Sequence, residues 1–155
     1  MYDSCDCASD LRDLAYHCQE LVTMEKDLQA IRYQIETLTV SGGIVKVSRD
    51  KNATYHEGHD QELFFLMERE EMMKINFSAL RSHMRKVCRV LALMNLDELQ
   101  LKALRLKYEK NLSYEGVGQQ LFCSAGKAWM IITELTNRFA EIYNSLPEIS
   151  RRTRR

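Results

Sequence analysis

Residues 63–94 read LFFLMEREEMMKINFSALRSHMRKVCRVLALM and contain neither glycine nor proline. Apolar side chains recur through this stretch at alternating steps of three and four residues, and Glu70 is the one interruption. This spacing is typical of a helix that packs lengthwise against another helix. The predicted stripe consists of Leu63, Leu66, Met73, Phe77, Leu80, Met84, Val87, Leu91 and Met94.

Residues 8–39 carry a similar stripe, which Glu25 and Arg32 interrupt. Its members are Leu11, Leu14, Cys18, Leu21, Leu28 and Ile35, widened by Met24, Ile31 and Leu38. Two helices of similar length joined by a connector at 40–60 predict a long antiparallel hairpin over residues 1–94. Dimerisation of two chains through the same stripes is the competing arrangement.

The hairpin interpretation makes two local predictions. Pairing residue i with residue 99 − i would bring Asp10 near Arg89 and Asp13 near Lys86, so that acidic and basic helix ends face each other. Within the connector, residues 44–47 and 49–52 could form a small β-hairpin, or the connector could be a mobile tip.

Glycine and proline are scarce along the whole chain. The 155 residues include six Gly and one Pro, and 1–41, 59–115 and 127–146 contain none. Sheets need turn residues at much shorter intervals, so we expect an all-α fold. No apolar run is long enough to span a membrane, and we expect a cytoplasmic protein with reduced cysteines.

The charges are distributed unevenly. Residues 1–78 hold 8 basic and 15 acidic side chains, a net charge of −7, whereas 79–155 hold 14 and 7, a net charge of +7. Residues 147–155 are predicted to be a disordered basic tail that can contact phosphates. A basic stripe of Arg81, Arg85, Lys86 and Arg89 could pair with the acidic first helix or contact a DNA backbone.

The sequence of residues 95–146 predicts a small helical bundle in which two helices have capping residues. Residues 96–110 form a helix that Asn111 ends, and Ser113 can cap the next one. Gly118 is small where two helices would cross, residues 122–124 form a turn, and Ser124 can cap a helix from Ala125. Its buried side would hold Ala128, Ile131 or Ile132, and Leu135. A small residue, a turn and a capped amphipathic helix together indicate a helix-turn-helix.

Residues 104–121, LRLKYEKNLSYEGVGQQL, resemble the fourth region of bacterial sigma factors, whose pattern is roughly L-x-L-R-Y-x-x-G-L-S-Y-x-E-I-A-x-x-L-G-x-S. The whole layout is similar to phage late-gene transcriptional regulators of the ArpU/RinA type. The motif resemblance covers about 96–140, and the hairpin resembles that family by architecture only. It implies a bacteriophage regulator that binds double-stranded DNA and acts with the RNA polymerase of the bacterial host.

Carried over to this chain, the resemblance implies a DNA-binding helix that starts at Ser124. The implied groove-facing residues are Ser124, Ala125, Gly126, Lys127, Trp129, Met130 and Thr133, with Ser113 capping the preceding helix. Phosphates would be contacted by Arg138 and by Arg151, Arg152, Arg154 and Arg155. The chain departs from the pattern at Phe122, where Gly is usual, and at Gly118, where Ala is usual. Lys127 is the one cation in the groove-facing set, which lacks Arg, Asn and Gln.

Other interpretations stay open at this point. Trp129 and Met130 could belong to the core, or could bind a protein instead of DNA, which would make the chain a protein-binding module. A DNA-packaging protein of the small-terminase type would also combine these elements. Neither zinc binding by Cys5, Cys7, His17 and Cys18 nor metal binding by His56 and His59 matches a usual ligand spacing. We therefore expect no cofactor and no enzymatic activity.

Overall fold

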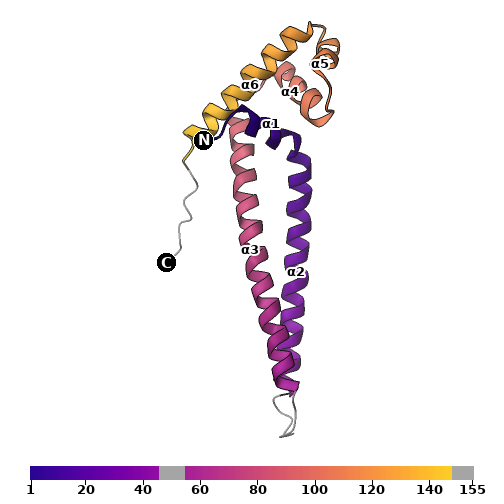
Figure 1. The fold of residues 1–155 in the computed structure, drawn as a ribbon, viewed down its shortest axis with the longest axis vertical. Helices are drawn as coiled ribbons and strands as arrows, with labels where there is room; N and C mark the ends of the chain where they lie inside the picture. The colour runs from indigo at the N-terminus through magenta and orange to yellow at the C-terminus, as the bar shows by residue number, and fades with distance from the viewer. Residues whose placement is uncertain (46–54, 148–155) are drawn as a thin grey trace. The chain divides into compact units, whose positions relative to one another are not determined.

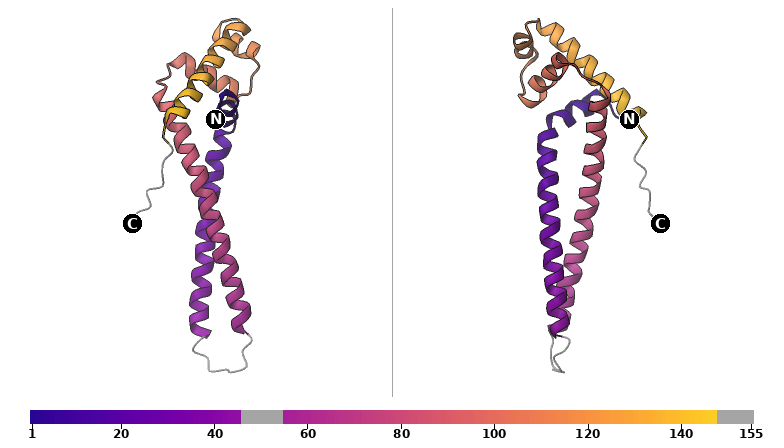
Figure 2. Two further views of the ribbon diagram at one scale, coloured as in Figure 1. Left: turned by 60° about the vertical axis from the view of Figure 1, so that its left-hand side comes forward. Right: turned by 180° about the vertical axis from the view of Figure 1, so that it is seen from behind.

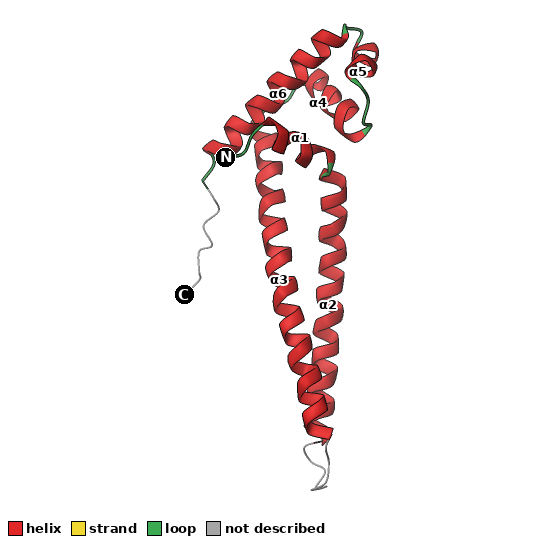
Figure 3. Ribbon diagram, viewed as in Figure 1, coloured by secondary structure: helices red, strands yellow, loops and turns green. Residues whose placement is uncertain are grey.

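The structure is a computed structural model that describes residues 1–45 and 55–147, and the side chains of 1–40 and 60–147 (Figure 1). Helices are the one kind of regular secondary structure within these ranges, so the all-α prediction is confirmed (Figure 3). The chain divides into two compact units. Met1–Cys18 and Ser82–Arg155 form what we call the core unit, and Gln19–Arg81 form the helix-pair unit.

The division differs from the predicted boundary after residue 94. Cys7 near the N-terminus and Val87, Val90 and Met94 near the end of the long helix are each fully buried in the core unit. They share one cluster with Phe139. Because these side chains have their apolar partners in the helix-turn-helix region, the first eighteen residues and residues 82–94 belong to that unit.

The predicted helix over 8–39 is broken at Asp13. It begins earlier, as α1 (Ser4–Arg12), and continues as α2 (Leu14–Val45). The Asp3 carboxylate caps α1 by accepting from the Cys5 and Asp6 amides at 2.8 and 3.0 Å. Asp13 has φ −94° and ψ 5°, which leaves the helical region and lets α1 pack separately against α6 (Ala125–Ser145).

The predicted connector at 40–60 is shorter than expected. α2 runs on to Val45, and α3 (Tyr55–Leu93) starts before residue 60. Residues 44 and 45 are helical and not extended, and the other residues of the predicted β-hairpin lie outside the described residues. Gly42 and Gly43 lower helix propensity by about 1 kcal/mol each, but both keep the N–H that a helix needs, so the helix continues through them.

In the helix-pair unit, α2 and α3 run side by side in opposite directions (Figure 2). Leu28, Ile31 and Leu66 are buried there. The two charged residues that interrupt the stripes contact each other, with Arg32 Nε 3.3 Å from Glu70 Oε1. The predicted register placed Arg32 opposite residue 67, so the observed partner, Glu70, lies less than one helical turn from the predicted position. Lys74 Nζ lies 2.8 Å from the same oxygen, and this hydrogen bond is the main cause of the lowered pKa of Glu70.

The rest of the core unit consists of three short helical segments and the longer α6. They are α4 (Glu98–Leu104), a π-helical turn η1 (Arg105–Glu109), α5 (Tyr114–Leu121) and α6. Asp97 and Gln100 form a reciprocal capping box at the start of α4. Asn95 and Asn111 have φ values of 51° and 53°, so each stops a helix in the left-handed conformation, as predicted for Asn111. None of the helices within the described ranges is both long and apolar enough to cross a membrane.

A hydrogen-bonded chain of side chains joins α1, α3 and α6. Tyr2 donates its hydroxyl proton to Asp10 at 2.6 Å, and His83 Nε2 lies 3.0 Å from both Asp10 oxygens. The hydroxyl of Tyr143 lies 3.0 Å from His83 Nδ1. Because a carboxylate can only accept, a proton on Nε2, with Nδ1 accepting from Tyr143, satisfies both contacts of the neutral ring.

This arrangement corrects the predicted pairing of the helix ends. Asp10 was expected near Arg89, but its carboxylate is occupied by Tyr2 and His83. Lys86 was expected near Asp13, but its Nζ lies 4.0 Å from the centre of the Tyr143 ring. The break at Asp13 ends α1 before α2 begins, so a register that assumes one continuous helix fails for its first turns.

We predict that Cys7 is protected from thiol reagents in the folded protein. Burial, reinforced by the Asp10 carboxylate, raises the pKa of Cys7 to about 12. At pH 8 its alkylation should be at least about a hundredfold slower than that of Cys5, which is exposed on the same helix. Mass spectrometry of peptides after timed labelling measures both rates. Equal rates would contradict the packing of α1.

Candidate nucleic-acid interface

A tight turn centred on Phe122 separates α5 from α6. Phe122 has φ 56° and ψ 41°, the left-handed conformation, and the Cys123 amide donates to the Gly118 carbonyl at 2.9 Å. Ser124 returns to extended backbone and caps α6, since its Oγ accepts from the Lys127 amide at 3.1 Å. The short α5 and the longer α6, joined in this way, have the helix-turn-helix order that the sequence predicts.

Gly118 allows this turn to close. A Cβ atom at this position would lie 2.7 Å from the carbonyl oxygen of Cys123 and 3.1 Å from that of Ser124. Both neighbours are backbone atoms, so a side chain would have to push the two helices apart. At Gly126, by contrast, an added Cβ would meet nothing within 4 Å.

The inner face of α6 is buried against the core. Ala128, Ile132, Leu135 and Phe139 are at most 3% exposed. This settles the choice between Ile131 and Ile132, since Ile132 is the more deeply buried of the two. The spacing of three and four residues commits one side of the helix to the core and leaves the other side outward.

The structure brings the predicted groove-facing positions together on that outward side. Six of the seven are exposed and Thr133 is half-buried; the exposed six are Ser124, Ala125, Gly126, Lys127, Trp129 and Met130. Trp129 is 51% exposed and Met130 is 64% exposed. Of the two interpretations of these side chains, core packing is therefore wrong and a surface position is right.

A lysine that the sequence analysis did not single out lies at the start of α5. Lys107 Nζ donates to the Leu112 carbonyl at 3.2 Å and lies 4.2 Å from the centre of the Tyr114 ring. The Ser113 hydroxyl caps α5 by accepting from the Gly116 amide at 3.2 Å. The sequence signal was available, because Lys107 matches the Arg of the sigma-factor pattern. Lys107 and the helix N-terminus contribute positive charge to this corner, and Glu115 in the first turn of α5 contributes negative charge.

Arg138 has a structural partner. Its guanidinium donates to the carbonyl of Met94 at 2.6 Å. Met94 directly follows α3 and precedes the left-handed Asn95. A cation at this place satisfies a carbonyl that the helix itself leaves unpaired. The other predicted phosphate contacts, Arg151, Arg152, Arg154 and Arg155, lie outside the described residues.

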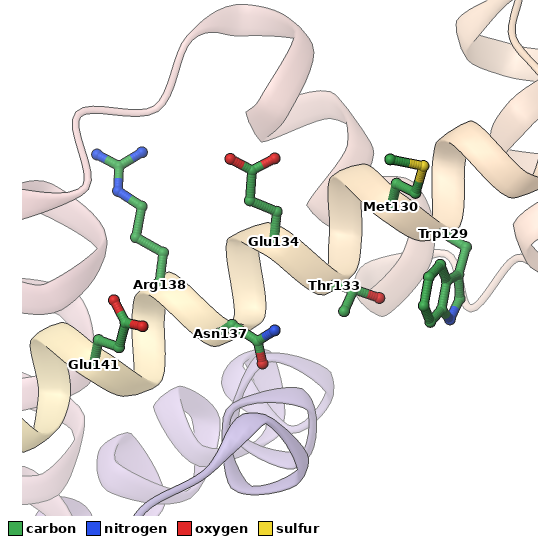
Figure 4. Close-up of a pocket in the computed structure, with 7 residues that line it drawn as sticks. All are labelled: Trp129, Met130, Thr133, Glu134, Asn137, Arg138 and Glu141. Carbon is green, nitrogen blue, oxygen red and sulfur yellow. The ribbon is translucent and has the colours of Figure 1, made fainter.

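An open groove of about 520 Å³ follows α6 from its second turn towards its C-terminal end (Figure 4). Glu134 and Arg138 project to the same side of the helix in this view. The lining is mixed, apolar near the start and acidic further along; it consists of Trp129, Met130, Thr133, Glu134, Asn137, Arg138 and Glu141. The outer surface of α6 is therefore apolar in its second turn and mainly polar and charged beyond it.

Metal ligands do not gather within the described ranges, where no group of three or more His, Cys, Asp or Glu side chains could hold an ion. Cys7 is buried, whereas Cys5 and Cys18 are exposed. The side chains of His56 and His59 lie outside the described part.

Comparison with protein-family models, with curated protein sequences and with solved structures finds no significant match for this chain.

We predict that Phe122→Gly stabilises the protein although it removes a large apolar side chain. Phe122 is 97% exposed, so little packing is lost, and the left-handed conformation costs an L-residue about 1–2 kcal/mol. The greater freedom of glycine in the unfolded chain offsets part of this gain, which leaves about 0.5–1 kcal/mol. Urea unfolding followed by circular dichroism measures the change.

Phe122→Ala is the matched control, because it removes the same ring but keeps a Cβ at positive φ. Its free energy of unfolding should stay within about 0.5 kcal/mol of the original. A Phe122→Gly protein less stable than the Phe122→Ala protein would show that the turn is not strained.

Proposed function

We propose that this protein is a DNA-binding transcriptional regulator that inserts the first two turns of α6 into the major groove. The observation that carries the proposal is the exposed outer face of α6 behind a turn that separates it from α5. In helix-turn-helix proteins the second helix lies in the groove with its N-terminal residues at the bases, while the first crosses the backbone.

The start of α5 supports a phosphate contact in this arrangement. The Ser113 cap and Lys107 lie at its N-terminus, where backbone N–H groups and the helix dipole favour an anion. Lys127 is exposed in the first turn of α6 and supplies the positive charge inside the groove. The tail arginines and the free edge of Arg138 would add contacts that do not depend on sequence.

The regulatory role rests on the resemblance of residues 96–140 to the fourth sigma region. That resemblance makes bacterial RNA polymerase the expected protein partner and the bacterial cytoplasm the expected place of action, in a phage-infected cell. Because the motif is brief, binding to DNA and action on transcription are separate parts of the proposal.

Homodimerisation also belongs to the proposal. On α3, Phe64, Phe65, Met72 and Ile75 are 48–68% exposed, which is unusual for side chains of this size. A second copy would cover this apolar surface and would supply the paired half-sites that helix-turn-helix dimers read. Light scattering reports the number of subunits, and a large closed ring would instead indicate a packaging protein.

We predict that Lys127→Ala weakens duplex binding about tenfold. It should also lower the slope of log affinity against log salt concentration by about one, because one fewer counterion is released on binding. The test selects a site from a random duplex pool at low salt and then measures affinity by fluorescence anisotropy over a salt series. Lys26→Ala, which removes an exposed lysine from the helix-pair unit, is the control and should change neither value. Equal binding by both variants would contradict the placement of α6 in the groove.

We predict the opposite effect for Glu134→Gln. Glu134 is exposed on α6 one residue beyond Thr133, close enough to repel phosphates of a duplex held by the first two turns. Its neutralisation should tighten binding about two- to fivefold at low salt, and the gain should fade as salt screens the charge. Glu36→Gln on α2 is the matched control. A loss of affinity on Glu134→Gln would indicate that the carboxylate contacts a base.

Protein binding is the second candidate function, and one observation favours it. Trp129 and Met130 open onto the α6 groove, whose far half carries Glu134 and Glu141, and aromatic residues with methionine are enriched at protein interfaces. Failure to bind any duplex at low salt, together with a stoichiometric complex with purified RNA polymerase, would favour this function over DNA binding.

A further inference from the structure

The first two turns of α6 offer few groups that can hydrogen-bond to a base. The Ser124 hydroxyl oxygen already accepts from the Lys127 amide, and Ala125 and Gly126 have no polar side-chain atoms. The side-chain donors are the Lys127 ammonium, the indole N–H of Trp129, and the hydroxyl groups of Ser124 and Thr133. Direct readout of adenine uses the paired donor and acceptor of Asn or Gln, and neither residue occurs in residues 124–133.

The same two turns offer a large apolar surface. Trp129 and Met130 are 51% and 64% exposed, and the half-buried Thr133 adds a methyl group one turn further along. Gly126 lies one turn before Met130 on the same side of the helix, with open space where a side chain would be. The missing side chain lets a groove wall approach the Met130 thioether.

The major groove presents one apolar group, the C5-methyl of thymine. A cytosine at the same position carries only a hydrogen at C5. An apolar surface in the groove can therefore tell A·T from G·C pairs, and T·A from A·T pairs, by where the methyl groups fall. Burial of one methyl group changes affinity by about fourfold.

We infer that Trp129, Met130 and Thr133 read the DNA site through thymine methyl groups, with Lys127 the single hydrogen-bonding cation beside them. This inference rests on the proposed function, because it names the chemistry that the same α6 surface recognises. It accounts for a recognition helix that lacks bidentate readers and yet keeps two large apolar side chains exposed to water. The selected sites should contain thymines at two or more fixed positions.

The test replaces thymine by deoxyuridine, which removes only the methyl group, in the site selected from the random pool. The original protein should bind the deoxyuridine duplex about tenfold or more weakly, which corresponds to two or more contacted methyl groups. Single replacements then locate the contacted thymines, each with a loss of about fourfold.

The variant Trp129→Ala with Met130→Ala separates methyl contact from altered DNA shape. Both side chains are exposed, so circular dichroism should show an intact fold. This variant should bind the thymine and deoxyuridine duplexes with nearly equal affinity, whereas Lys127→Ala should weaken both duplexes by the same factor. An undiminished preference for thymine in the double variant would assign the effect to DNA shape and overturn the inference, whereas the remaining Thr133 methyl group accounts for at most a small residual preference.

Two further outcomes distinguish the inference from the proposed function. Selective binding of one duplex site, with equal affinity for its thymine and deoxyuridine forms, would overturn methyl readout and leave DNA binding intact. Failure to bind any duplex at low salt would overturn both, and would leave the exposed Trp129 and Met130 as a protein-binding surface.

Discussion

The close approach of Gly118 to the carbonyl groups of Cys123 and Ser124 is the constraint on which the proposed interface depends. Because no side chain intervenes, the turn can place α6 across the core with Ala128 and Ile132 buried. With Ala128 and Ile132 facing the core, the opposite side of α6, which carries Lys127, is exposed to water. One missing methyl group thus determines which side of α6 is available to a partner, and the strained Phe122 is the cost of the tight bend.

Three of the fourteen basic side chains in residues 79–155 contact other parts of the core unit. Arg138 binds the end of α3, Lys86 lies against Tyr143, and Lys107 lies against Tyr114. These contacts use positive charge to join helices, which a count of charged residues along the chain does not reveal. A net charge of +7 over residues 79–155 therefore does not give the number of cations free to bind phosphates, because Lys107 and Arg138 could offer only the N–H groups that these contacts leave unused.

Local patterns in the sequence predicted much of this fold because their causes are local. Helical spacing identified the inward side of α3, and the capping hydroxyls of Ser113 and Ser124 identified two helix starts. The break at Asp13 and the hydrogen bonds of His83 with Asp10 and Tyr143 were missed. The hydrogen bonds join residues up to 73 positions apart, which no pattern within one helix can report. Lys107 was missed although the family pattern marks its position.

The outer surface of α6 is apolar near Trp129 and Met130 and acidic at Glu134 and Glu141, and this difference bears on how the protein would act if it binds DNA as proposed. One cation in the groove releases few counterions, so electrostatic attraction contributes little, and apolar contacts act only after the helix has entered the groove. Glu134 and Glu141 oppose a longer contact along the same helix. Affinity sufficient for regulation would then require a second source of binding energy, such as the tail, another copy or polymerase on the same promoter. Weak readout by α6 is therefore better suited to a regulator that binds jointly with polymerase than to a repressor that occupies its operator alone.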